Sequence, residues 1–159
     1  MIHIFGISSF LNMALGKVVN SNNKVVMIGF DDGWKSQITY AKPILDKYGF
    51  KASFFIVCNY ANSGNIDRMN WQDIAMLQKD SMDIESHSMT HPNDLNMLNQ
   101  NQLDYQIGGS KQCLASHGYN STIFAYPYNI GSNDPTVINT VVLVIFVRSI
   151  QISAQFNST

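Results

Sequence analysis

Short apolar runs alternate with stretches of helical periodicity through the middle of the chain, and this alternation constrains the fold more than any other feature. Continuous β-branched or aromatic runs of about four to eight residues predict buried strands, whereas apolar residues that recur every three or four positions predict helices. Strands that alternate with helices form a parallel sheet or barrel, so the sequence predicts an α/β fold. The predicted strands are 24–30, 52–57, 82–86 and 121–126, and the predicted helices are 36–48, 71–79 and 95–116.

The C-terminal part of the chain has a different pattern. Asp134-Pro135 is typical of a helix start, and the run 141–147 that follows is apolar throughout. Because this run is too short to span a bilayer, we predict a buried strand there and no transmembrane span. Residues 149–159 show no clear organisation, and we interpret 139–159 as a diverged tail.

Length and charge restrict the class of protein. The 159 residues, 45% of them apolar, can bury one core, which predicts a single domain. Ten basic against eleven acidic residues, without a lysine or arginine run, argue against a nucleic-acid partner. The N-terminal segment is apolar and has no basic residue before Lys17, so it is a poor secretion signal. The structure of residues 1–23 stays open between an export remnant, a helix and a strand.

The chain has two cysteines, Cys58 and Cys113, which allow one disulfide but do not form a disulfide framework. Neither lies in a Cys-x-x-Cys arrangement. Because free cysteines are usually buried, we predict two separate, half-buried thiols.

Ionisable and aromatic residues gather where the predicted strands end. In parallel α/β folds, catalytic groups collect at the C-terminal ends of the strands. The residues at such ends are Asp31, Asp32, His87, His91 and the turn Tyr126-Pro127-Tyr128. This edge is therefore the candidate functional site.

One carboxylate and two imidazoles, from Asp32, His87 and His91, form a ligand set that suits Zn²⁺ or a similar divalent ion. The His-x-x-x-His spacing alone is weak support, because histidines four residues apart are common on solvated faces. The adjacent acids Asp31 and Asp32 strengthen the case, since they repel each other unless a cation lies beside them or they perform different tasks. A metal bound by one of them would account for the pair.

Three ordered motifs resemble those of a known family. Phe30-Asp31-Asp32-Gly33, His87-Ser88-Met89-Thr90-His91-Pro92 and Phe124-Ala125-Tyr126-Pro127-Tyr128 are similar to the first three motifs of the polysaccharide deacetylases, the NodB-homology or carbohydrate esterase family 4 enzymes. The resemblance covers about residues 24–138, which we predict as one NodB-like domain. It implies a partial or distorted (β/α) barrel that lacks the last βα units. It also implies a metal-dependent hydrolase that removes N-acetyl groups from polysaccharides containing N-acetylglucosamine.

The resemblance also implies roles for single residues. Asp32, His87 and His91 would bind the metal, with zinc as the expected ion and cobalt, nickel, manganese or iron as alternatives. Asp31 would be the general base for the attacking water. The backbone N–H of Tyr128 would stabilise the oxyanion, because Pro127 has no N–H. The expected substrate contacts are Trp34, Tyr126, Pro127 and Tyr128, although Trp34 could equally close the top of the barrel.

The sequence departs from the family pattern in two places. Ala125 stands where many members have an arginine that orients the catalytic base. The later family motifs, including the histidine that acts as general acid, have no counterpart, because no histidine follows His117. We predict His117 itself to cap a helix end. The chain is therefore expected to be truncated or to have a diverged tail, which a reading-frame change near Val141 would explain.

The missing acid leaves two other functions open. The chain could be a weak or inactive metal-binding protein that binds carbohydrate, or a hydrolase of cyclic imides or other amides. An N-acetylated glycan is the expected partner, and the sequence does not predict an oligomeric state. A polymeric substrate favours an extracellular or cell-surface location, but without a clear signal peptide a cytoplasmic location stays open.

Overall fold

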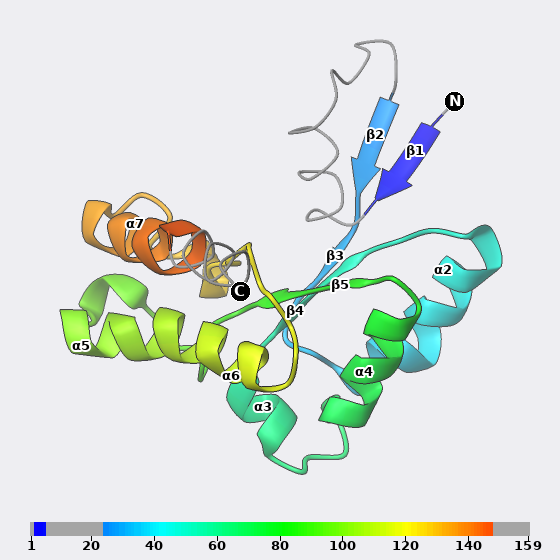
Figure 1. The fold of residues 1–159 in the computed structure, drawn as a ribbon, viewed down its shortest axis with the longest axis horizontal. Helices are drawn as coiled ribbons and strands as arrows, with labels where there is room; N and C mark the ends of the chain where they lie inside the picture. The colour runs from blue at the N-terminus through cyan, green and yellow to red at the C-terminus, as the bar shows by residue number, and fades with distance from the viewer. Residues whose placement is uncertain (1, 6–23, 148–159) are drawn as a thin grey trace, which may run out of the picture. The chain divides into compact units, whose positions relative to one another are not determined.

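The computed structural model describes residues 2–5 and 24–147, and Figure 1 labels its strands and α-helices. The strands are β1 (Ile2–Phe5), β2 (Lys24–Met27), β3 (Gly29–Phe30), β4 (Ser53–Ile56) and β5 (Asp83–Ser86). The first helices are η1 (Gln37–Ala41), α2 (Lys42–Tyr48), α3 (Cys58–Asn62) and α4 (Trp71–Lys79), where η marks a 3₁₀- or π-helical segment. Later helices are η2 (Leu95–Met97), α5 (Gln100–Leu103), η3 (Asp104–Gly109), α6 (Ser110–Ser116), η4 (Pro127–Asn129), α7 (Pro135–Val141) and η5 (Val142–Val147).

The strands form two parallel sheets, as the alternation of strands and helices predicts. β3, β4 and β5 form one sheet in that order, and Gly29 and Phe30 pair with Ser53 and Phe54 in parallel register. β5 runs in the same direction, because Asp83 and His87 donate their N–H groups in step to Ala52 O and Ile56 O. β1 and β2 form a separate parallel pair, so the predicted strand 24–30 is confirmed but is divided at Ile28.

The chain forms two compact units, and the first consists of residues up to Phe55 together with Tyr60–Ile84. Its helix at 36–48 is confirmed and comprises η1 and α2, ending at Gly49, whose φ of 67° is the left-handed conformation that glycine adopts easily. The predicted helix 71–79 is α4. It begins with a capping box in which Asn70 and Asp73 each accept the other's backbone N–H at 3.0 Å.

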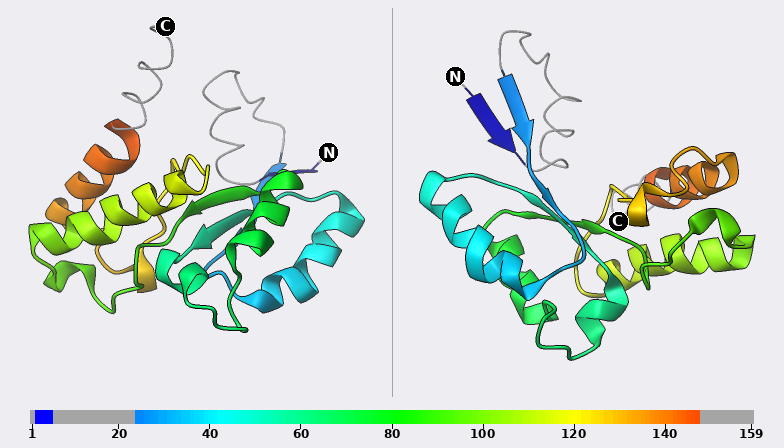
Figure 2. Two further views of the ribbon diagram at one scale, coloured as in Figure 1. Left: turned by 60° about the horizontal axis from the view of Figure 1, so that its bottom comes forward. Right: turned by 180° about the vertical axis from the view of Figure 1, so that it is seen from behind.

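The second unit consists of Ile56–Asn59 and the chain from Glu85 onwards. The predicted helix 95–116 is confirmed from Gln100 to Ser116 as a continuous helix of α5, η3 and α6, preceded by the short turn η2. Figure 2 shows this helix beside α7 and η5. Side chains from both layers form the core: Leu95, Leu103, Ile107, Phe124, Val137, Val141, Val144 and Ile145.

Two predicted strands are wrong. Residues 142–147 continue α7 as the π-helical η5, burying Val144 and Ile145 but leaving Leu143 61% exposed. A run that is apolar at every position has no detectable period, so its sequence cannot distinguish strand from helix. Residues 121–126 contribute only an isolated parallel bridge between Phe124 and Ser86, because the backbone N–H groups of 122 and 123 bind the Glu85 carboxylate.

The prediction of two separate thiols is also wrong. Cys58 and Cys113 form a disulfide across 55 residues of sequence, with their Cα atoms 6.5 Å apart. The fold explains this pairing, because Cys58 begins the helix after β4 and Cys113 lies on α6 in the same compact unit. Neither fact can be derived from the local sequence. Among the helices in the described ranges, none is long and apolar enough to cross a membrane.

Candidate metal centre

The turn Asp31-Asp32-Gly33 follows β3 and has unusual backbone geometry. Asp32 has a φ of 70° and Gly33 a φ of 64°, so both residues adopt left-handed conformations. This conformation is uncommon for a residue with a side chain, and surrounding contacts must hold it. The Asp32 carboxylate accepts a hydrogen bond from within the same turn, where Trp34 Nε1 donates to Asp32 Oδ2 at 3.2 Å.

Hydrogen bonds with residues 67–69 hold this turn. Lys35 N donates to Asp67 O and Met69 N donates to Gly33 O, both at 2.8 Å. Arg68 Nη1 donates to Asp32 O at 3.0 Å. The carboxylate of Asp32 therefore projects from a turn that is fixed along its backbone.

His87 lies directly after β5 and is 3% exposed. Its Nδ1 lies 2.9 Å from Ala125 O. Because a carbonyl oxygen only accepts, Nδ1 carries a hydrogen, and in the neutral ring the lone pair is then on Nε2. An imidazole held through Nδ1 to a carbonyl is the usual arrangement of a histidine that binds metal through its other nitrogen.

The loop 88–91 carries His91. Its N–H donates to Ser88 Oγ at 2.9 Å, and His91 and Ser88 have φ values of 58° and 71°. The His91 ring meets the rings of His87 and Tyr128 edge-on, with centroids 4.8 and 4.7 Å away. The loop therefore brings the His91 imidazole against that of His87, which follows β5.

Gln106, on η3, anchors the same loop and was not singled out by the sequence analysis. Its side chain accepts from Thr90 N at 3.0 Å and donates to Thr90 Oγ1 at 2.8 Å. Its backbone oxygen accepts from Met89 N at 3.0 Å. A helical glutamine carries no sequence signal for this role, because only the tertiary contact reveals it.

Glu85 is a second residue that sequence reasoning missed. It is 2% exposed, and its Oε2 accepts from Ser121 Oγ, Thr122 N and Ile123 N at 2.8–2.9 Å. These bonds fix the segment leading to Ala125, whose carbonyl orients His87. An acid within a short predicted strand, two residues before His87, was the available signal.

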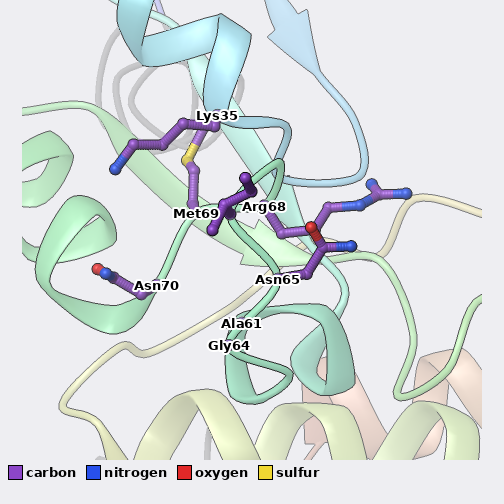
Figure 3. A pocket seen from close by; sticks show the side chains of 8 residues that line it. Lys35, Ala61, Gly64, Asn65, Arg68, Met69 and Asn70 are labelled. Carbon is purple, nitrogen blue, oxygen red and sulfur yellow. The ribbon is translucent and has the colours of Figure 1, made fainter.

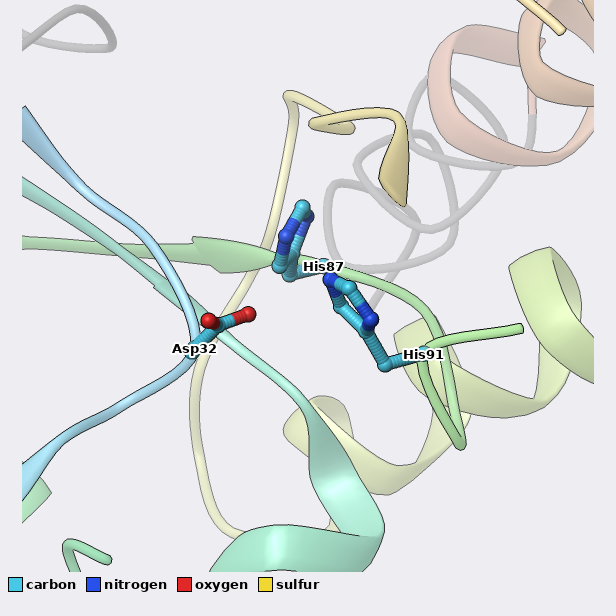
Figure 4. A group of neighbouring side chains, drawn as sticks. All are labelled: Asp32, His87 and His91. Atoms are coloured by element: carbon cyan, nitrogen blue, oxygen red, sulfur yellow. The ribbon is translucent and has the colours of Figure 1, made fainter. Parts of the chain in front are cut away.

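The predicted metal ligands come together. One ligand atom from each of Asp32, His87 and His91 lies within 4.8 Å of the others, and Figure 4 draws the three side chains. One carboxylate oxygen and two imidazole nitrogens are the donor set of a catalytic zinc site that keeps positions open for water. The residues present therefore fit a divalent metal.

The other predicted site residues have varied environments. Asp31 is exposed, and its carbonyl accepts from Gln37 Nε2 at 2.6 Å. Trp34 is 40% exposed, and the Arg68 guanidinium lies 3.3 Å from its ring centroid, so one face of the ring is already covered. His117 ends α6, where its Nδ1 donates to Cys113 O at 3.0 Å, and this confirms the predicted cap.

The turn at 126–128 follows the Phe124 bridge. Tyr126 packs edge-on against Phe124, with ring centroids 5.4 Å apart, and burial raises the pKa of its phenol above the usual value. Pro127 is buried at the start of η4. Tyr128 is 63% exposed and has a left-handed backbone with a φ of 53°. The Tyr128 ring contacts His91, a predicted metal ligand.

A pocket of about 290 Å³ lies in the first unit between Lys35 and the segment 61–70. Figure 3 shows the side chains of Lys35 and Arg68 extending in opposite directions. The Lys35 ammonium pairs with Asp73 at 2.6 Å, and the Arg68 guanidinium lies over Trp34. Both cations are therefore engaged within the protein, and so are the amide oxygens of Asn65 and Asn70, which also line the pocket.

Comparisons with known proteins agree with the motifs. Residues 18–142 match the family described as polysaccharide deacetylase. YxkH of Bacillus subtilis, named as a candidate polysaccharide deacetylase, is 30% identical over 107 residues, which are 67% of this chain and 37% of that protein.

Two solved structures share the fold. The Streptococcus pyogenes deacetylase PplD in complex with acetate has a TM-score of 0.81 at 22% identity, covering 91% of this chain and 63% of that one. A family 4 carbohydrate esterase from Streptomyces lividans in complex with acetate has a TM-score of 0.63 at 25% identity, covering 74% and 57%. These likenesses show the α/β fold of NodB-type deacetylases, of which this chain forms a partial barrel.

The family match covers most of the chain, whereas the chain itself spans 37% of the length of YxkH. Family membership rests on this match and on the order of the three motifs within it. The activity, substrate and partners of a whole protein do not follow from it directly. The chain belongs to the polysaccharide deacetylase family.

Proposed function

We propose that this chain is a metal-dependent hydrolase that removes N-acetyl groups from a polysaccharide containing N-acetylglucosamine. The observation that carries the proposal is the group Asp32, His87 and His91, whose ligand atoms lie within 4.8 Å of one another in a polysaccharide deacetylase domain. A donor set of one carboxylate and two imidazoles favours zinc, with cobalt, nickel, manganese or iron as alternatives. Such an ion would polarise the acetamide carbonyl and make water a stronger nucleophile.

Asp31 is the proposed general base. Its neighbour Asp32 supplies the carboxylate for the ion, and Asp31 is exposed to solvent. A carboxylate next to the attacking water can accept its proton. The carbonyl of Asp31 is held by Gln37 at 2.6 Å, which limits the movement of this residue.

The backbone N–H of Tyr128 is the proposed oxyanion donor. Its ring packs against His91, which places the residue next to a proposed metal ligand. The left-handed backbone of Tyr128 and Asn129 is a conformation that single functional residues often retain despite its cost. Trp34, Tyr126, Pro127 and Tyr128 remain the proposed substrate contacts, with Trp34 offering the ring face that Arg68 does not cover.

A second candidate function is a metal-binding protein that binds carbohydrate with little or no turnover. It is favoured by His117, whose imidazole is engaged at the end of α6 with Cys113 O. Expulsion of an amine needs a proton donor, and a positioned acid is typically worth about 10² to 10⁴ in rate. An alcohol leaves more easily, so the 159-residue chain should cleave acetyl esters faster than acetamides.

Acetate release from N-acetylglucosamine oligomers separates the two functions. The chain is loaded with Zn²⁺ or Co²⁺, and acetate is measured from the oligomer and from an acetyl ester. Slow, metal-dependent release from the oligomer, with faster ester cleavage, supports the hydrolase. Oligomer binding without release of acetate from either substrate supports the carbohydrate-binding function instead.

We also propose an extracytoplasmic location, because the Cys58–Cys113 disulfide is of a kind that persists in oxidising compartments. The chain is produced with and without an export signal, and free thiols are alkylated before mass analysis. Disulfide in the exported chain only, with retained metal binding, supports the proposal. Equal metal binding and stability in the reduced cytoplasmic chain would contradict it.

A further inference from the structure

Arg68 connects the loop before α4 to the turn that carries Asp32. Its guanidinium carbon lies 3.3 Å from the centroid of the Trp34 ring and 4.1 Å from that of the Tyr60 ring. A planar guanidinium stacks on aromatic rings in a way that an ammonium cannot. Two aromatic rings therefore fix the plane of the Arg68 head.

The same head makes a directed contact with the backbone of Asp32. Arg68 Nη1 donates to Asp32 O at 3.0 Å, and a bridge pairs Trp34 with Arg68 in antiparallel register. The left-handed conformation of Asp32, at a φ of 70°, is unfavourable for a residue with a side chain. A charge-assisted hydrogen bond to its carbonyl is of the right size to offset that cost.

Arg68 is itself firmly held. Its N–H donates to Asn65 O at 3.0 Å, and Asn65 Oδ1 accepts from Asp67 N at 2.9 Å. On the other side, Lys35 pairs with Asp73, which caps α4. These contacts tie both the loop of Arg68 and the Asp32 turn to the start of α4.

From this geometry we infer that Arg68 is a positioning residue for the carboxylate of Asp32, an inference that rests on the proposed metal role of Asp32. Arg68 acts through the peptide of Asp32 and through Trp34, whose Nε1 donates to Asp32 Oδ2. Its guanidinium fixes both the backbone of Asp32 and the Trp34 ring, which orients the Asp32 carboxylate oxygen. Nothing in the local sequence around Arg68 indicates this function.

The test compares the metal affinity of Arg68→Ala and Arg68→Lys with that of the unsubstituted chain, using Co²⁺ and its absorption bands. Residues that support a metal ligand are typically worth about 10- to 100-fold in affinity, so Arg68→Ala should weaken Co²⁺ binding by at least about tenfold. Arg68→Lys keeps the charge and the aliphatic stem but cannot stack, so it should recover only part of the affinity. Methylguanidinium at low, non-denaturing concentration should restore the Co²⁺ affinity of the Arg68→Ala variant.

Lys47→Ala is the matched control, because Lys47 lies over the exposed Tyr48 ring at 5.3 Å on α2. It removes a cation–aromatic contact elsewhere and should leave Co²⁺ affinity unchanged. Circular dichroism establishes that each variant is folded at the temperature of titration. If Arg68→Ala does not fold, Arg68→Lys decides the question.

The outcomes separate the inference from the proposed function. Absence of Co²⁺ binding by the unsubstituted chain would refute the metal site itself. Tight binding by the unsubstituted chain and equal binding by folded Arg68 variants would refute the positioning role alone. Weakened binding that methylguanidinium restores would establish that role.

Discussion

Left-handed backbone at residues other than glycine is concentrated in the three motifs. Among the described residues it occurs at Asp32, Ser81, Ser88, His91, Tyr128 and Asn129; Ser81 lies outside the motifs, and Asn129 directly follows the third. Each such residue costs of order 1–3 kcal/mol and persists where neighbouring contacts hold it. The contacts are present here, from Arg68 to Asp32 O and from His91 N to Ser88 Oγ. This conformational strain therefore coincides with the candidate metal centre.

At the same scale, the two adjacent aspartates should be separable by substitution. Asp31→Asn should keep metal affinity within about tenfold, or roughly 1.4 kcal/mol, while abolishing acetate release. The reason is that Asp32 supplies the carboxylate ligand and Asp31 the base. Metal titration and acetate release are measured on the same preparation. Loss of the metal together with the activity would mean that the roles of Asp31 and Asp32 are reversed.

Among the elements, η3 has a function that its sequence does not show. Gln106 binds the loop 88–91 through both ends of its amide and through its backbone oxygen. The helix therefore serves the core with Ile107 and the candidate metal centre with the preceding residue. Adjacent positions on one helix support separate tasks.

Gln106→Leu should loosen the histidine loop without breaking the helix. Leaving the Thr90 N–H without its acceptor should cost about 1–3 kcal/mol of unfolding free energy. Metal affinity should fall by about tenfold or more, because the His91 loop loses its anchor. Gln112→Leu, at an exposed position on α6, is the control and should change neither quantity. Unchanged metal affinity in Gln106→Leu would show that contacts within the loop 88–91 are enough to position His91.

Periodicity predicts elements well where one face is buried and poorly where apolar residues are continuous. The helix 71–79 begins at its Asn70 cap and agrees with the structure, because caps and period give the same answer. The run 141–147 is helical although its sequence has no period. Residues 121–126 could have paired as a strand, but the buried carboxylate of Glu85 binds two of their N–H groups. That competition depends on tertiary contacts.

At the scale of the whole molecule, the motif residues could be predicted from the sequence, whereas the residues that hold them in place could not. Ligand type and strand-end position identified Asp32, His87 and His91, which the structure brings together. Arg68, Gln106 and the disulfide act across long sequence separations, so no local pattern indicates them. The domain boundaries at 23 and 138 remain predictions, while the family match extends over 18–142.

The disulfide should contribute to global stability. Closing a 55-residue loop removes entropy from the unfolded chain, worth about 4 kcal/mol in the loop-closure estimate. Cys58→Ser with Cys113→Ser should lower the unfolding free energy by roughly that amount, measured by urea denaturation. Cys58 N also donates to Ser88 O at 3.3 Å, and this backbone bond does not depend on the thiol. The free energy of metal binding should therefore change by less than the free energy of unfolding. Equal stability with and without the disulfide would contradict this expectation.

The central claim is that Asp32, His87 and His91 bind a divalent metal, and metal content tests it most directly. After loading with Zn²⁺ and dialysis, elemental analysis should find about one zinc per chain for the unsubstituted protein and for His117→Ala, whose histidine caps α6. His87→Ala and His91→Ala should each lose stoichiometric zinc while remaining folded, because two protein ligands hold the ion far more weakly than three. Undiminished zinc in folded His87→Ala and His91→Ala would contradict the account.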